Sequence, residues 1–178
     1  MSEQRTGHRR VDRIRDQAYV ENIDALPLDD LRNRRDECLA EREYLSLLRR
    51  LVQGRAEILR AELDARGSSE DKGPLIDRLA QILAGDERQS PARGEAVKIG
   101  LPEEEMLLAR RRIERLVSDA GISDPSALDD ANLASAVELL AAEEREVSLA
   151  RSDVIRVLDT LQDELKRRYR EDPTLVLS

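Results

Sequence analysis

Apolar residues recur at alternating spacings of three and four along two long stretches of the sequence. They run from Leu28 to Leu63 in the first stretch and from Val137 to Leu165 in the second. This spacing places apolar side chains on one face of a helix and is typical of coiled coils. We therefore expect an all-α protein in which two long helices form an antiparallel coiled-coil hairpin, with short helices in the connection.

Start and stop signals for helices divide the chain into predicted parts. A Leu-Asp-Asp run precedes each long stretch, and its aspartates can cap the first amides of a helix. The Arg-rich N-terminus is interpreted as a solvated tail or as an arm that contacts an acidic partner. The predicted parts are a flexible basic tail over residues 1–24, a helical region over 25–171 with long helices at about 29–66 and 129–171 and short helices at about 74–84 and 102–120, and a C-terminal tail over 172–178.

Composition and charge exclude several classes of protein. The chain has 178 residues, of which 2% are aromatic and 38% are charged, and its net charge is −8. Scarce aromatic residues disfavour strands, and a negative charge disfavours unspecific binding to DNA. A single Cys and a single His exclude an internal disulfide and a zinc site built on these residues.

The sequence also lacks the features of membrane proteins and enzymes. No apolar run reaches the roughly 20 residues that cross a bilayer, and no signal peptide is present. There is no Gly-rich phosphate loop, no metal-ligand cluster and no nucleophile–base arrangement with supporting spacing. We expect a cytoplasmic protein that is not an enzyme and holds no metal.

Charged residues interrupt both apolar seams near mid-length. Arg35, Arg42 and Arg49 occupy seam positions in the first stretch, and Glu144 and Arg151 do so in the second. A charge buried there is costly unless a partner meets it. Arg42 or Arg49 can pair with Glu144 across the coil, the charges can set the register of the helices, or a polar ligand can lie between them.

A repeated polar pattern favours the ligand. Aligning Ser46 with Ser148 gives two copies of a pattern whose spacings of four, three, four and four place five residues on one helical face. Two such faces would form a polar slot of pseudo-twofold shape. Arginine pairs with phosphate or with the O6/N7 edge of guanine, and a carboxylate accepts from the opposite guanine edge. The positions are Arg42, Ser46, Arg49, Gln53 and Glu57 in the first copy and Glu144, Ser148, Arg151, Ile155 and Asp159 in the second.

Three runs of residues resemble a known family. They are Ser-Leu-Leu-Arg-Arg-Leu-Val-Gln-Gly-Arg at 46–55, Ile-Leu-Arg-Ala-Glu-Leu at 58–63 and Arg-Arg-Tyr-Arg at 167–170. These runs are similar to those of RsiG-type anti-sigma factors of actinobacteria, whose two long helices each carry the pattern E-x3-S-x2-R-x3-Q-x3-D. The resemblance covers about residues 26–171.

The resemblance implies both a ligand and a partner. It implies that the two motif helices bind a dimer of cyclic di-GMP, and that the loaded protein sequesters WhiG, a flagellar-type sigma factor that drives late sporulation genes. The sequence departs from the family pattern at Arg42, where the family has Glu, at Glu57, where the family has Asp, and at Ile155, where the family has Gln. A nucleotide-independent anti-sigma factor and a structural coiled-coil adaptor are the alternatives. The implied ligand-binding residues are Arg42, Ser46, Arg49, Gln53, Glu57, Glu144, Ser148, Arg151 and Asp159.

Overall fold

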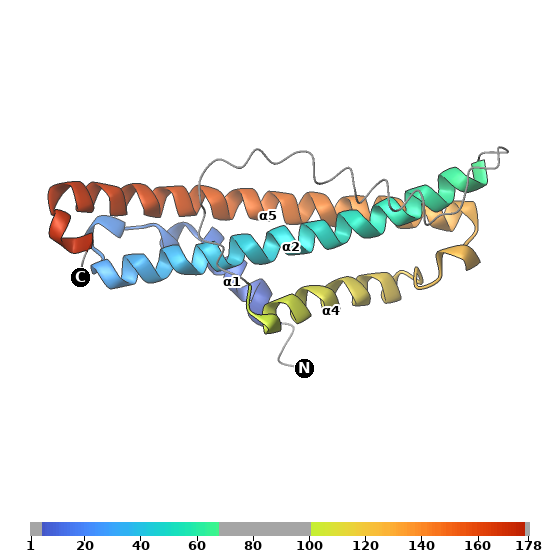
Figure 1. Ribbon diagram of the computed structural model, residues 1–178, viewed down its shortest axis with the longest axis horizontal. Helices are drawn as coiled ribbons and strands as arrows, with labels where there is room; N and C mark the ends of the chain where they lie inside the picture. Colours follow the sequence, from blue (N-terminus) through green and yellow to red (C-terminus); the bar gives the residue numbers. More distant parts are fainter. Residues whose placement is uncertain (1–4, 68–100, 177–178) are drawn as a thin grey trace. The chain divides into compact units, whose positions relative to one another are not determined.

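The computed structural model describes residues 5–67 and 101–176, and these residues form helices joined by short turns (Figure 1). No strand occurs in these two ranges. The predicted short helix at 74–84 lies outside the described residues. The elements are α1 (Arg5–Arg15), η1 (Gln17–Tyr19), η2 (Ile23–Ala25), α2 (Leu28–Gly67), α4 (Glu103–Asp119), η4 (Pro125–Ala127), α5 (Asp130–Glu171) and η5 (Pro173–Val176).

The all-α fold and the three predicted helices that can be compared are confirmed. The bounds of α2, α4 and α5 lie within one residue of those expected from the seam and the stop signals. The Asp129 carboxylate accepts a hydrogen bond from the amide N–H of Asn132 at 2.7 Å, so it caps the start of α5 as predicted.

The chain divides into two compact units, each built on one half of α2 and one half of α5. The first unit contains residues 1–47 and 146–178, and the second contains residues 48–145. In both units the apolar seam positions form the core, so the predicted seam is confirmed. The buried seam residues are Leu31, Cys38, Leu45, Val147, Val154, Leu158, Leu161 and Leu165 in the first unit, and Val52, Ala56, Leu59, Val137 and Leu140 in the second. The end positions Leu28 and Leu63 are half-buried.

An arginine near the end of each long helix holds the turn before the other long helix. In the first unit, Arg168 of α5 donates to the carbonyl oxygens of Ile23 and Leu26, both at 2.7 Å. In the second unit, Arg66 of α2 donates to the carbonyl oxygens of Leu128 at 2.5 Å and Pro125 at 3.0 Å. Within each unit the end of one helix therefore lies beside the start of the other, which makes them antiparallel (Figure 1).

The two arginine contacts belong to a tandem repeat with a constant separation of 102 residues. The same separation relates α1 to the middle of α4, η2 to η4, and Ser46 to Ser148. Each repeat therefore consists of a short helix, a turn and a long helix. The repeat-related pairs include Arg10 and Arg112, Leu31 and Leu133, Glu41 and Glu143, Glu62 and Glu164, and Arg66 and Arg168.

The solvated tail expected over residues 1–24 is wrong for residues 10–24, because this segment packs on the first unit. Val11, Ile14 and Tyr19 are buried. Arg10 forms an ion pair with Glu41, whose side chain is fully buried. The basic arm thus contacts acidic residues of its own chain, and three apolar side chains among many arginines are enough to dock it.

The repeat supplies a matched test of this docking. Arg10→Met should lower the free energy of unfolding by about 3 kcal/mol, because it leaves a buried carboxylate without its arginine. The equivalent Arg112 is 41% exposed in its ion pair with Glu143, so Arg112→Met should cost only about 0.5 kcal/mol. Urea unfolding followed by circular dichroism measures both, and equal losses would contradict the buried role of Arg10.

Glu164 provides a test in acid. Hydrogen bonds from Arg167 and Arg168 lower the pKa of its carboxyl group from 4.5 to about 2. The carboxylate therefore stabilises the fold at neutral pH, and this contribution is lost as the pH falls from about 4.5 toward about 2. Glu164→Gln should lower the melting temperature by about 5 °C at pH 7 and by much less near pH 2. The exposed Glu171→Gln is the control, and a deficit that persists unchanged in acid would refute the assignment.

Candidate ligand site

The two copies of the polar pattern lie on α2 and α5, and each copy contributes to both units. The first unit holds Arg42, Ser46, Ser148, Arg151 and Asp159, and the second holds Arg49, Gln53, Glu57 and Glu144. Glu57 and Asp159 are exposed, and the other seven side chains are half-buried. The charged seam positions are therefore accessible to solvent and are not sealed in the core.

In the second unit, Arg49 and Gln53 of α2 converge on Glu144 of α5. Arg49 Nε donates to Glu144 Oε1 at 2.7 Å, and Gln53 Nε2 donates to the same oxygen at 3.2 Å. The expected pairing of an arginine with Glu144 is thus confirmed for Arg49. The side chain of Arg49 is 42% exposed and that of Glu144 is 25% exposed, so water screens this ion pair.

In the first unit, Arg151 of α5 reaches Ser46 of α2. Arg151 Nε donates to Ser46 Oγ at 2.9 Å, while Ser46 Oγ donates to the carbonyl oxygen of Arg42 at 2.7 Å. The Arg42 side chain pairs instead with the neighbouring Glu43, with Nη2 2.7 Å from Oε1. Because Arg42 stands where the repeat has Glu144, Arg151 meets a hydroxyl group in place of a carboxylate.

Repeat-related arginines thus both reach across to the other helix, but they meet side chains at different positions of the repeat. Arg49 and Arg151 each donate through Nε to a side chain of the other motif copy. The equivalence stops at the next position, where Gln53 donates to Glu144 but the half-buried Ile155 has no polar group. The structure brings Arg49, Gln53 and Glu144 together, and it brings Arg151 and Ser46 together. Glu57 and Asp159 stand apart from these bonds.

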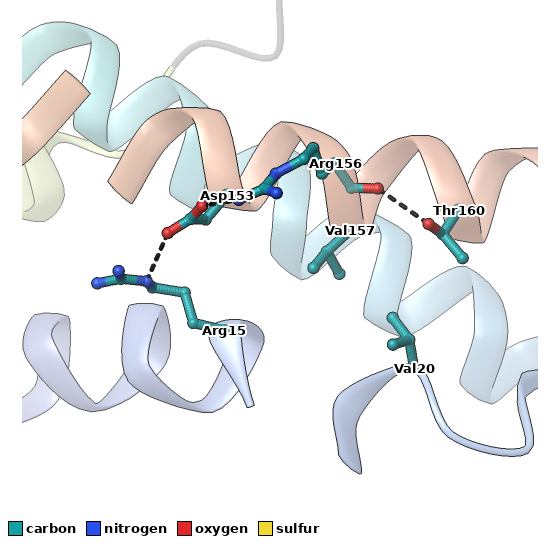
Figure 2. Close-up of a pocket in the computed structure, with 6 residues that line it drawn as sticks. All are labelled: Arg15, Val20, Asp153, Arg156, Val157 and Thr160. Atoms are coloured by element: carbon teal, nitrogen blue, oxygen red, sulfur yellow. Dashed lines mark hydrogen bonds and ion pairs between the residues drawn. The ribbon is translucent and has the colours of Figure 1, made fainter. Parts of the chain in front are cut away.

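Sequence reasoning missed the place of α1 beside this site. Arg15 Nε lies 2.8 Å from Asp153 Oδ2 on the turn of α5 that follows Arg151, and Figure 2 shows this pair at one side of an open pocket. The pocket has a volume of about 400 Å³ and is also lined by Val20 and Thr160. The separation of 102 residues is the signal that finds α1, because it carries the predicted helix at 102–120 back onto residues 1–18.

Neither a metal site nor a membrane span is found in the part of the chain that the structure describes. Across residues 5–67 and 101–176, no group of three or more His, Cys, Asp or Glu side chains is placed to hold a metal ion. Over the same ranges, no helix combines the length and apolar character that a membrane span requires.

A double-mutant cycle on Arg49 and Glu144 tests how much their pair contributes to folding. The variants Arg49→Ala, Glu144→Ala and the double variant should give a coupling energy of about 0.5 kcal/mol, because both side chains are partly exposed. Urea unfolding of the protein without ligand measures it. A coupling energy above about 2 kcal/mol would mean that the pair serves mainly to fix the register of the coil.

Comparison with known families agrees with this geometry. Residues 17–83 match a family described as RsiG-like, and this region includes η1, η2, all of α2 and the first motif copy. No curated protein matches the chain. The second motif copy lies outside the matched region, and its likeness rests on the repeat. The resemblance to RsiG-type anti-sigma factors is therefore confirmed over residues 17–83, which match the RsiG-like family.

Proposed function

We propose that this protein is a cytoplasmic anti-sigma factor that binds a dimer of cyclic di-GMP through its two motif copies and, when loaded, sequesters a WhiG-like sigma factor of the late sporulation programme. One observation carries the ligand part of the proposal. Arg49 and Arg151, at equivalent positions of the repeat, both reach across to a polar side chain of the other motif copy. This arrangement supports binding of a ligand that presents the same groups twice.

The polar side chains match the chemistry of cyclic di-GMP. Guanidinium groups pair with phosphate oxygens and with the O6/N7 edge of guanine, and these bonds are strengthened by charge. Glu144 offers a carboxylate to the N1–H and N2–H donors of guanine, and Ser46 and Gln53 add short polar contacts. Arg42 brings further positive charge for phosphate, whereas Ile155 offers only an apolar contact.

Ligand binding would exchange partners at the motif. In this structure, Arg49 and Gln53 both donate to Glu144. A guanine nucleotide supplies acceptors for Arg49 and donors for Glu144, so both groups keep a partner when their mutual bond breaks. The ligand then favours whichever arrangement of the helices it binds best, by an amount limited to its differential affinity.

The charge of the chain suits a sigma factor as partner. Its net charge is −8, and sigma factors present basic surfaces to promoter DNA. Complementary charge steers two proteins together and suppresses wrong partners. The protein thus acts by occupying a sigma factor, with no reaction of its own and no metal.

The nucleotide-independent anti-sigma factor remains the second candidate because of one observation. Arg49 and Glu144 form an ion pair with each other, and this pair can serve the coil alone. A structural adaptor would bind neither nucleotide nor sigma factor.

Calorimetric titration with cyclic di-GMP tests the ligand. Wild-type protein should bind two molecules per chain, and Arg49→Ala and Arg151→Ala should each weaken binding roughly 10–100-fold, the loss expected for a hydrogen bond to a charged group. Arg50→Ala, which removes an exposed arginine next to Arg49, is the matched control and should leave binding unchanged. Cyclic di-AMP should not compete, because adenine lacks the guanine O6 acceptor. Equal binding by the Arg49 and Arg50 variants would refute the site.

A further inference from the structure

Tyr19 fills a distinct place in the first unit. Its side chain is 7% exposed, and its hydroxyl group donates to Glu37 Oε2 at 2.6 Å. The guanidinium carbon of Arg34 lies 5.2 Å from the ring centre, a cation–π contact. The aromatic ring therefore lies between the turn after α1 and the first part of α2, with a carboxylate and a guanidinium group beside it.

The second unit has an open pocket at the equivalent place. The separation of 102 residues relates Tyr19 to Gly121, Arg34 to Ala136 and Glu37 to Leu139. Gly121, Ala136 and Leu139 all line a pocket of about 480 Å³, together with Leu128 and Asn132. A Cβ atom added to Gly121 would have nothing within 4 Å, and Leu139 is 40% exposed.

The pocket keeps the position of the ring but not its polar partners. Leu139 removes the carboxylate that accepts the tyrosine hydroxyl, and Ala136 removes the guanidinium that covers the ring. What is left favours an aromatic ring without a hydroxyl group or a charge. We propose that this pocket receives a phenylalanine side chain of a partner protein, as an anchor of the kind that dominates protein interfaces.

The ring must come from another protein, because this chain has no aromatic residue to spare. It contains three Tyr and neither Phe nor Trp. Tyr19 and Tyr44 are buried. The ring of Tyr169 contacts Arg32, whose guanidinium carbon lies 5.9 Å from the ring centre. The proposed sigma factor is the natural source of the phenylalanine, and only this identification rests on the proposed function.

Binding of a phenylalanine ring in this pocket can be tested without a sigma factor or a nucleotide. Full-length protein is titrated with N-acetyl-phenylalanine amide and, as the control without a ring, with N-acetyl-alanine amide. Nuclear magnetic resonance follows the Gly121 amide and the methyl groups of Ala136 and Leu139. We expect saturable shifts at these groups with the phenylalanine probe, at millimolar affinity, and none with the alanine probe.

Two variants show whether the shifts come from this pocket. Leu139→Glu places a charge on its wall and should weaken binding of the phenylalanine probe at least 5-fold. Leu149 lies on the same helix outside the pocket and is 59% exposed. The variant Leu149→Glu is the control and should bind the probe like wild type. Equal shifts with the two probes, or unchanged binding by Leu139→Glu, would overturn the proposal. If the chain itself already fills the pocket, neither probe can enter it, and the two probes give equal shifts.

The sigma factor then separates this inference from the proposed function. Leu139→Glu should weaken binding of the sigma factor at least 10-fold while leaving cyclic di-GMP binding unchanged. If the sigma factor binds Leu139→Glu and wild type equally, and still requires the nucleotide, the sigma factor does not place a phenylalanine in this pocket and the proposed function stands. If the wild-type protein binds no sigma factor, the proposed function fails, and the fragment titration still decides whether the pocket takes a ring.

Discussion

Charged side chains within the otherwise apolar seam of two long helices impose the constraint on which the rest of this structure depends. A guanidinium or carboxylate group at such a position must find a partner or remain in contact with water. Here both happen, since Arg49 bonds to Glu144 while both side chains stay partly exposed. Apolar residues at these positions would give a plain coiled coil. The half-buried polar groups instead remain in contact with water, and under the proposed function their bonds are exchanged for bonds to a nucleotide.

The tandem repeat explains both what the two units share and where they differ. Equivalent arginines near the helix ends, Arg66 and Arg168, hold equivalent turns, and equivalent seam residues form both cores. Many positions differ between the two copies, and some of these differences fall where we assign function. Arg42 is the repeat equivalent of Glu144, and Tyr19 is the repeat equivalent of Gly121. The two units thus share one arrangement of helices, while they carry different polar and aromatic residues at equivalent positions.

Much of the fold could be predicted from the sequence, because spacing alone specifies a buried face. The seam from Leu28 to Leu63 predicted the length of α2 and part of its buried face, and the pairing of Arg49 with Glu144 was one of the expected solutions. The buried Glu41 and Leu48 lie off the seam and were not predicted. The docking of α1 was not predicted, because few apolar residues lie among its arginines and the ion pair of Arg10 with Glu41 depends on packing. The turns held by Arg66 and Arg168 use carbonyl oxygens, which every residue carries and no sequence pattern marks.

The dissociation constant of the complex with a WhiG-like sigma factor, measured at zero and at saturating cyclic di-GMP, tests the central claim most directly. If the motif bonds are exchanged for ligand bonds in the form that holds the sigma factor, the nucleotide should tighten the complex at least 10-fold, and Arg49→Ala should abolish this gain. A complex of the same affinity with and without the nucleotide would contradict the account and leave the Arg49–Glu144 pair as a structural feature of the coil.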